Sequence, residues 1–296
     1  MKRNVRAFKQ VDVFTAEPYR GNPLAVVLDG CGLSDAEMQQ FTDWSNLSEA
    51  TFVLPPSNDL ADYRVRIFCP GRELPFAGHP TLGNCHAWLE AGGVAKDSAI
   101  VQECGVGLVK IRRDGNRLAF AAPPRRNQGP LDPAEVDLIT RGLGLSAGDI
   151  TDHAWCDNGP RWRGVLLRSA ELALALKPNA AILTGLYVGV VGPSAKVGVV
   201  GHCAGGGTSP GVDEDVAFEV RAFFPGNSGM VEDPVTGSLN AGLARWLIGA
   251  GHAPANYVAS QGTALGRAGR VYIESAEGEI WVGGESVTCI DGHIRI

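Results

Sequence analysis

Short runs of alternating apolar and polar residues fill the first half of the chain, the pattern of half-buried β-strands. Gly, Pro and Asn separate these runs and favour turns between them. Weaker helical periodicity predicts amphipathic helices at residues 34–44 and 133–142. The clearest predicted strands are residues 10–14, 25–28, 51–54 and 63–68.

Two longer segments carry apolar residues at helical spacing and predict the main helices. The first begins near Pro80, because proline is tolerated in a first helical turn, and stops at the glycine pair 92–93. The second begins near Gly237 and ends at the glycines of residues 249–251. Their apolar faces are formed by Leu82, Cys85, Trp88 and Leu89 and by Leu239, Leu243, Trp246 and Leu247.

These two helices belong to a repeated pattern. Residues 66–71 (Arg-Ile-Phe-Cys-Pro-Gly) match residues 221–226 (Arg-Ala-Phe-Phe-Pro-Gly) at an offset of 155, and Trp-Leu at 88–89 matches Trp-Leu at 246–247 at an offset of 158. A three-residue insertion reconciles the two offsets. The order of strand, Pro-Gly turn, loop and Trp-Leu helix therefore occurs twice, which indicates a duplication with its boundary in the Pro-rich stretch 123–130. We expect an α+β fold of two similar domains, each a mostly antiparallel sheet wrapped around one helix.

Composition restricts the class of protein. The 296 residues, 45% hydrophobic and 20% charged, are typical of a globular protein with room for two domains. A formal charge of −6 and scattered Lys and Arg residues argue against a nucleic-acid partner. No apolar run has the length of a signal peptide or membrane span, and the seven cysteines form no Cys-x-x-Cys pair. We therefore expect a cytoplasmic protein with no membrane partner and no zinc site.

Three polar segments, at residues 46–49, 78–81 and 232–238, are the candidates for chemistry, since the usual nucleotide, zinc-protease and serine-hydrolase motifs are missing. The second and third segments open the two main helices, where free backbone N–H groups attract anions. Two helix starts that face one cleft would hold a carboxylate ligand without a metal. The plainer alternative is that Asp233, Thr236 or Ser238 only caps its helix.

Glu49 and His79 extend this candidate site. Glu49 stands in an otherwise apolar and small-polar run, where burial can raise the pKa of a carboxyl toward neutrality, as a general acid/base needs. His79 lies between Gly78 and Pro80, which let the backbone approach a ligand and fix the direction of the ring. The alternatives are an exposed turn residue for Glu49 and a structural histidine for His79.

Five blocks of the sequence resemble the PhzF-like (phenazine-biosynthesis-like) isomerases, in family order and over nearly the whole chain. The resemblance implies a diaminopimelate-epimerase-like fold with the active site between two related domains, and a homodimer. We place the domains at residues 1–125 and 126–283, and the C-terminal strand, about residues 284–296, can return to the first domain. The blocks are Val11-Asp-Val-Phe-Thr with Gly21-Asn-Pro-Leu-Ala-Val, Asn46-Leu-Ser-Glu-Ala-Thr-Phe, Glu73-Leu-Pro-Phe-Ala-Gly-His-Pro-Thr-Leu-Gly83, Glu232-Asp-Pro-Val-Thr-Gly-Ser238, and Gln261-Gly followed by Leu265-Gly-Arg and Gly269-Arg270.

The resemblance also implies roles for individual residues. Glu49 is similar to the proton-shuttling carboxylate of the family and Asp233 to its second acid. His79 and Ser238 resemble the groups that position the substrate, with Gly78 and Gly237 as backbone N–H donors and Thr236 beside them.

Racemases and epimerases of this fold use two cysteine thiols at the helix starts. The matching positions in this chain are Ala77 and Thr236, while Cys69 lies in the preceding turn. A thiol-dependent racemase is therefore disfavoured.

The prediction is a cofactor-independent isomerase that moves a proton on a small carboxylic acid. Its catalytic residues are Glu49, Asp233 and His79, and no metal takes part. The alternatives are a non-catalytic protein of the same fold that binds small acids or a partner, and, less favoured, an amino-acid racemase or epimerase.

Overall fold

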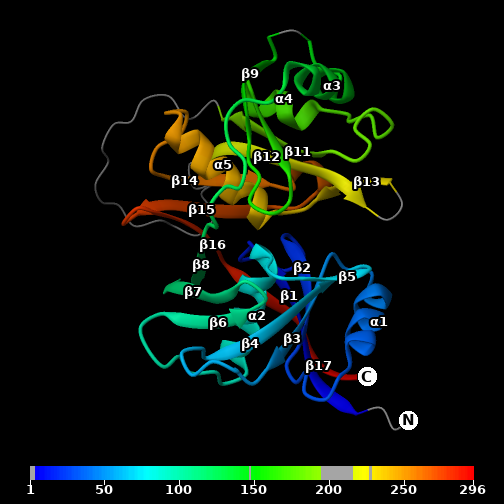
Figure 1. Cartoon of the computed structure of the whole chain (residues 1–296), viewed down its shortest axis with the longest axis vertical. Coiled ribbons are helices and arrows are strands. Elements are labelled where there is room, and N and C mark those ends of the chain that lie inside the picture. Colours follow the sequence, from blue (N-terminus) through cyan, green and yellow to red (C-terminus); the bar gives the residue numbers. More distant parts are fainter. Residues whose placement is uncertain (1–3, 147, 195–215, 227–228) are drawn as a thin grey trace.

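The chain folds as two β-rich halves, each built around one long helix (Figure 1). A computed structural model describes residues 4–146, 148–194, 216–226 and 229–296. The helix α2 (Gly78–Glu90) lies in the lower half of Figure 1 and α5 (Gly237–Gly249) in the upper half. The expected fold class, two similar halves of mostly antiparallel strands around a central helix, is confirmed.

The same order of elements occurs twice among the described residues, with α3 (Pro133–Leu143) between the two copies. The first copy consists of β1 (Val5–Val13), β2 (Asn22–Val27), α1 (Asp35–Ser45), β3 (Ala50–Leu54), β4 (Tyr63–Cys69), β5 (Arg72–Leu74), α2, β6 (Ile100–Cys104), β7 (Gly107–Asp114) and β8 (Arg117–Ala121). The second consists of β9 (Ile150–Trp155), β10 (Trp162–Leu167), α4 (Ala170–Ala175), β11 (Tyr187–Pro193), β12 (Val216–Gly226), β13 (Gly229–Asp233), α5, β14 (Asn256–Gln261), β15 (Gly269–Ala276) and β16 (Glu279–Gly284).

Strand pairing repeats along with element order. β2 pairs with β3 in parallel, as β10 does with β11, and β4 pairs with β6 in parallel, as β12 does with β14. The other pairings within each copy are antiparallel. Two copies that agree in order, direction and partner are the product expected of a duplication.

An ion pair occupies the same place in each copy. Arg66 on β4 holds Glu73 on β5 through two hydrogen bonds of 2.8 and 2.6 Å, and Arg221 on β12 holds Glu232 on β13 through two of 2.8 and 2.7 Å. The arginines are 155 positions apart and the glutamates 159. The insertion therefore has four residues and lies in the hairpin between β12 and β13.

The central helices correct one sequence match. Both have 13 residues, and their first residues, Gly78 and Gly237, are also 159 positions apart. Trp88 therefore corresponds to Leu247. The predicted match of Trp88-Leu89 with Trp246-Leu247 was wrong by one position, and the predicted insertion of three residues was one residue too short. One position is about 100° around a helix, so the two tryptophans face different neighbours. Trp88 packs on Tyr63 with ring centroids 4.8 Å apart.

Burial explains why both central helices are so apolar. Leu82 and Cys85 of α2 and Leu239, Leu243 and Leu247 of α5 are fully buried in one continuous core. Strands surround each helix, so a polar side chain there would need a buried partner. No helix of the described ranges has the length and hydrophobicity needed to cross a membrane.

The shorter helices begin at side-chain caps. Ser34 forms a capping box with Glu37 at the start of α1, and Asp132 caps α3, whose first residue is Pro133. Both helices agree with the predicted ranges within one residue at each end. The sequence did not predict α4, a helix of six residues that begins after its N-cap Ser169. Six residues are too few to show a clear helical period.

The last strand brings the end of the chain back to its beginning. β17 (Ser286–Arg295) pairs with β1 along its whole length, and a backbone hydrogen bond of 2.9 Å joins N of Asn4 to O of Ile296 in the lower half of Figure 1. β8 pairs with β16 and so links strands of the two copies. The domain boundaries at residues 125 and 283 stay predictions.

The first turns of α2 and α5 touch each other. A Cβ atom added at Gly237 would lie 3.1 Å from Cα of Gly78 and 3.2 Å from N of His79. A Cβ atom added at Gly78 would lie 2.6 Å from the buried Phe120 ring and 3.2 Å from Cα of Gly237. Glycine therefore permits this close approach of two helix starts.

We expect Gly78→Ala to lower the free energy of unfolding by roughly 1–3 kcal/mol, because the new methyl group must displace Phe120 or the start of α5. Gly249→Ala is the matched control in the last turn of α5, where an added Cβ meets nothing within 4 Å. The control should be neutral or gain up to about 1 kcal/mol from helix propensity. Denaturant unfolding measures both variants, and equal effects would contradict the close contact.

Candidate active site

Among the α-helices of the described residues, the two that meet are the two whose starts lack a side-chain cap. Ala77 and Thr236 stand at the N-cap positions of α2 and α5, and neither side chain accepts a hydrogen bond from its helix. Ser34, Asp132 and Ser169 do cap α1, α3 and α4. The sequence alternative that Asp233, Thr236 or Ser238 merely caps α5 is therefore wrong. The free N–H groups of two helix starts converge on one place, which favours an anion.

Glu49 lies at this place, directly before β3. Its side chain is 17% exposed and makes no hydrogen bond among the described residues. Burial raises the pKa of Glu49 to about 8, and the nearby Asp233 carboxylate adds to the rise. At neutral pH the carboxyl is therefore mostly protonated, and it can release its proton or take one up close to physiological pH. The alternative of an exposed turn residue is excluded.

His79 faces Glu49 from the first turn of α2. Its Nε2 atom is 3.5 Å from Oε2 of Glu49, and neither atom has a hydrogen-bond partner in the described part of the chain. Only 5% of His79 is exposed, and burial lowers its pKa to about 3. The contact is therefore between a neutral imidazole and a mostly protonated carboxyl, not an ion pair. A neutral ring with a buried, unpartnered nitrogen is suited to hydrogen-bond a ligand.

Asp233 ends β13 and has a different environment from Glu49. Its Oδ1 atom accepts a hydrogen bond from Nδ2 of Asn22 at 2.9 Å, and its Oδ2 atom accepts one from the Thr236 hydroxyl at 2.6 Å. Burial raises the pKa of Asp233 to about 6, and these two hydrogen bonds limit the rise. Near neutral pH the pair therefore holds its proton mainly on Glu49 while Asp233 is mostly ionised.

Asn22 and Gln261 complete the site, although no role was predicted for either of them. Nδ2 of Asn22 also donates to the carbonyl of Val235 at 2.8 Å, so the side chain joins β2 to the segment before α5. Gln261 is fully buried; its side chain accepts from N of Thr236 at 3.0 Å and donates to the Thr236 hydroxyl at 2.9 Å. Both residues lie in sequence blocks that resemble the PhzF-like isomerases, and this membership was the signal that could have identified them.

Ser238 is prepared to donate a hydrogen bond. Its Oγ atom accepts from the indole N–H of Trp162 at 3.0 Å, and within the described residues its own O–H has no acceptor. Nδ2 of Asn158 binds the Ser238 carbonyl at 2.7 Å and steadies the first turn of α5. Glu49, His79, Asp233, Ser238, Gly78, Gly237 and Thr236 all lie at or beside the two helix starts, so the fold brings together every residue that the sequence selected.

No thiol stands at either helix start. Cys69 ends β4 and is half-buried, and its pKa is raised mainly by burial, with a further rise from Glu49. It is therefore a neutral thiol beside the candidate acid rather than a nucleophile. Cys203 lies outside the described residues. Within the described ranges no three His, Cys, Asp or Glu side chains gather closely enough to hold a metal ion.

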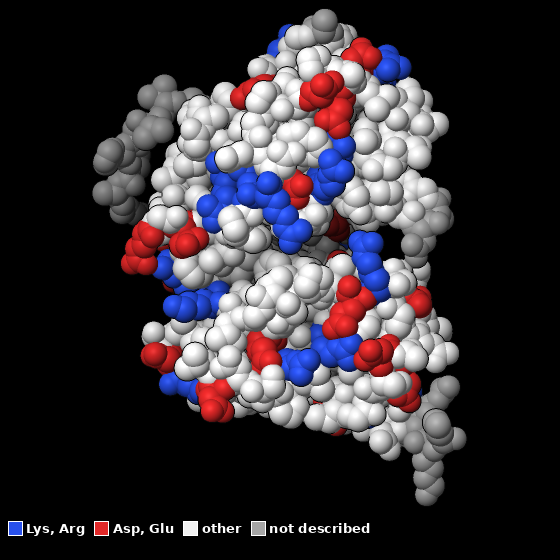
Figure 2. Space-filling view, in the orientation of Figure 1, with Lys and Arg blue, Asp and Glu red and all other residues white. Residues whose placement is uncertain are grey.

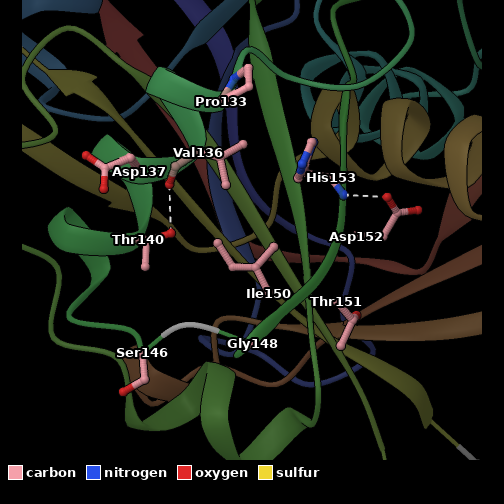
Figure 3. A pocket seen from close by; sticks show the side chains of 10 residues that line it. All are labelled: Pro133, Val136, Asp137, Thr140, Ser146, Gly148, Ile150, Thr151, Asp152 and His153. Atoms are coloured by element: carbon pink, nitrogen blue, oxygen red, sulfur yellow. Dashed lines mark hydrogen bonds between the residues drawn. The ribbon is translucent and has the colours of Figure 1, made fainter.

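A separate depression of about 620 Å³ lies at α3 and β9, away from the helix starts (Figure 3). Its polar groups already have partners: Nδ1 of His153 accepts from N of Leu131, and Asp152 accepts from N of His153 and pairs with His252. Because these polar groups are already satisfied, the depression is a weaker candidate than the helix starts, where Oε2 of Glu49 and Nε2 of His79 have no hydrogen-bond partner among the described residues. The depression is lined by Pro133, Val136, Asp137, Thr140, Ser146, Gly148, Ile150, Thr151, Asp152 and His153.

The surface between the halves is hollowed on the face drawn in Figure 2. Basic side chains of the upper half gather beside this hollow, although the whole chain has a formal charge of −6. A local positive field of this kind raises the concentration of small anions at this face.

Comparison with known proteins agrees with this architecture. The solved structure of a PhzF-family phenazine biosynthesis protein from Enterococcus faecalis superposes with a TM-score of 0.78, at 23% identity, over 99% of this chain and all of that one. That likeness carries the fold alone.

Two curated relatives match nearly the full length. "Antisense-enhancing sequence 1" of Schizosaccharomyces pombe is 36% identical over 97% of both chains. The trans-2,3-dihydro-3-hydroxyanthranilate isomerase of Pseudomonas aeruginosa is 35% identical over 95% of this chain and 92% of the relative. The family model described as phenazine biosynthesis-like protein matches residues 11–292. From the arrangement of its two halves, its site and these matches, the chain belongs to the PhzF family of phenazine biosynthesis-like proteins.

Proposed function

We infer that this protein is an isomerase that moves a proton between carbon atoms of a small carboxylic acid, without a cofactor. The observation that carries the inference is the pair of partly buried carboxyls at two uncapped helix starts, of which Glu49 has a pKa of about 8 and Asp233 one of about 6. Relatives named as isomerases, among them the one from Pseudomonas aeruginosa, support the reaction class.

The substrate carboxylate binds at the meeting point of α2 and α5. Free backbone N–H groups in the first turns, with those of Gly78 and Gly237 among them, approach its oxygens. The hydroxyl of Ser238 and the neutral ring of His79 add donors that are already held in place. Groups fixed before the ligand arrives stabilise the charge that develops on it, because they need little reorganisation.

Glu49 carries the proton. In its ionised form it takes a proton from a carbon next to the unsaturated system, and the electron pair of the broken C–H bond shifts into the conjugated system. The same proton then returns from the Glu49 carboxyl to a different carbon, so protons and electrons balance and no outside reactant is needed. A pKa of about 8 makes Glu49 a stronger base than an ordinary carboxylate.

Asp233 is the second carboxyl of the site and acts through its negative charge. Held by Asn22 and Thr236, it is mostly ionised near pH 7 and supplies negative charge beside Glu49, which keeps the proton on Glu49 between transfers. A homodimer, a cytoplasmic location and the absence of nucleic-acid partners stay predictions.

We expect Glu49→Gln to lower turnover by at least roughly 10²–10⁴-fold while ligand binding stays largely intact, because the amide keeps the shape but cannot shuttle a proton. The measurement is deuterium incorporation from D₂O, followed by NMR over a panel of small carboxylic acids, with isothermal titration for binding. Asp233→Asn should also be severely impaired, and His79→Ala should weaken binding as well as rate.

Glu274→Gln is the matched control, since Glu274 is an exposed glutamate on β15. It should exchange deuterium like the wild type. Near-normal exchange by Glu49→Gln would refute the mechanism, and wild-type binding without any exchange would favour the non-catalytic alternative.

The raised pKa of Glu49 also predicts how stability changes with pH. Between about pH 4.5 and 8 the folded chain holds a proton on Glu49 that the unfolded chain has lost, so the free energy of unfolding falls as pH rises through this window. Glu49→Gln removes this loss. Relative to the wild type, the free energy of unfolding of the variant should therefore increase by up to roughly 1.4 kcal/mol per pH unit. Denaturant unfolding at pH 5, 6.5 and 8 measures the difference, and a constant difference would contradict the raised pKa.

Cys69→Ser should keep deuterium exchange within about threefold of the wild type, because a neutral thiol beside Glu49 takes no part in bond making. The control is Cys289→Ser on β17, a half-buried cysteine outside the site. A selective loss of exchange in Cys69→Ser, with unchanged stability, would point back to thiol chemistry.

A further inference from the structure

Gln261 is fully buried at the end of β14, and its backbone neighbours fix the direction of its side-chain amide. Its Oε1 atom lies 3.0 Å from the backbone N of Thr236, which can only donate, and 2.8 Å from Nδ2 of Asn240. Its Nε2 atom lies 3.2 Å from the backbone O of Asp233, which can only accept. The reversed amide would set donor against donor and acceptor against acceptor. The nitrogen of Gln261 therefore faces Asp233 and the Thr236 hydroxyl.

The Thr236 hydroxyl has two partners and a single proton. Its Oγ1 atom lies 2.9 Å from Nε2 of Gln261 and 2.6 Å from Oδ2 of Asp233. Because Nε2 donates, the hydroxyl oxygen accepts from Gln261 and its own proton points to Asp233. This arrangement also explains why Thr236 does not cap α5, although it stands at the N-cap position. Gln261 thus makes the Thr236 hydroxyl a donor toward Asp233.

A backbone carbonyl fixes Asn22 in the same way on the other side of Asp233. Nδ2 of Asn22 donates to the carbonyl of Val235 at 2.8 Å and to Oδ1 of Asp233 at 2.9 Å. Each carboxylate oxygen of Asp233 therefore receives a donor whose direction is set by the backbone. Hydrogen bonds to the charged form of a carboxyl favour that form over the protonated acid.

The elements packed against Asp233 bring one titratable partner to it. Glu49 acts on it electrostatically, and the ring of His79 beside Glu49 is neutral because burial lowers its pKa. Glu49→Gln therefore removes the second titrating carboxyl of the pair. The residues that β2, β12 and β14 place beside Asp233 are all uncharged: Asn22, Ala222 and Gln261.

We propose that Gln261 is a positioning residue of the proton-transfer site, which acts through the Thr236 hydroxyl to keep Asp233 ionised and so leaves the proton of the pair on Glu49. The use of that proton rests on the proposed function. The hydrogen-bond relay from Gln261 through Thr236 to Asp233 is a property of the folded chain, and it can be tested without turnover.

The measurement is the pKa of Asp233, about 6 in this structure, by NMR titration of carboxyl-labelled aspartate in Glu49→Gln. Asp233→Asn identifies the signal. Thr236→Val keeps the shape of the side chain and removes the hydroxyl, so it should raise this pKa by roughly 1–2, as expected for one hydrogen bond to a charged group. Gln261→Met should raise it as well, because the hydroxyl is no longer held as a donor to Asp233. Thr236→Ser keeps the hydroxyl and should leave the pKa unchanged.

A double variant decides whether Gln261 acts through the hydroxyl. In the Thr236→Val background, Gln261→Met should leave the pKa of Asp233 unchanged, because the relay is already interrupted. Gln102→Met is the matched control. Gln102 is also a fully buried glutamine, and it donates to the hydroxyl of Thr81 at 3.0 Å instead of to Thr236. It should lose stability like Gln261→Met but keep the parent pKa of Asp233.

The consequence for the reaction is measured in the chain that keeps Glu49. Gln261→Met should move the low-pH limb of deuterium exchange to higher pH, because Glu49 is a weaker base when Asp233 carries a proton. Gln102→Met should leave that limb in place.

An unchanged pKa of Asp233 in Thr236→Val or in Gln261→Met would overturn the proposal. A further rise when Gln261→Met is added to Thr236→Val, or an equal rise in Gln102→Met, would also overturn it. If Gln261→Met does not fold, Thr236→Val and Thr236→Ser decide whether the hydroxyl donates to Asp233. The expected pKa changes without deuterium exchange in the wild type would refute the isomerase alone, and exchange with an unchanged pKa would refute the relay alone.

Discussion

The contact between the first turns of α2 and α5 is the constraint on which the site depends. Gly78 and Gly237 let two helix starts approach so closely that a Cβ atom at Gly237 would crowd the opposite backbone and one at Gly78 would collide with Phe120. Because neither helix has a side-chain cap, both leave N–H groups free at the meeting point. The positive ends of two helices thus act on one small volume, which no single helix start could achieve.

Burial raises the pKa of both carboxyls near this point, so burial alone would leave Glu49 and Asp233 with similarly raised pKa values. Hydrogen bonds separate them: Asn22 and Thr236 support the ionised form of Asp233, while Glu49 has no such partner. The Asp233 charge then raises the pKa of Glu49 further. A difference in partners therefore assigns the proton to one residue and the charge to the other.

The duplication kept the supports of the two helix starts, while residues at matching strand positions differ between the halves. Both halves hold the hairpin before the central helix with an arginine-glutamate pair, Arg66 with Glu73 and Arg221 with Glu232, so each helix start is held at a matching place. At matching strand positions the first half carries Glu49 and the second half carries Tyr187. The carboxyl with the raised pKa therefore belongs to one half alone.

The sequence by itself determined the two central helices and the duplication, because helical spacing and Pro-Gly turns are local properties of the chain. Its short motifs also selected seven candidate site residues, whose roles stay predictions. The sequence comparison of the two repeats aligned Trp88 with Trp246 instead of Leu247. Strand register shows the four-residue insertion in one hairpin that corrects this alignment. The sequence also gave no role to Asn22 and Gln261. Their partners lie at Asp233 and Thr236, far away in sequence or across the two halves, and the pKa values of Glu49 and Asp233 depend on burial that only tertiary packing creates.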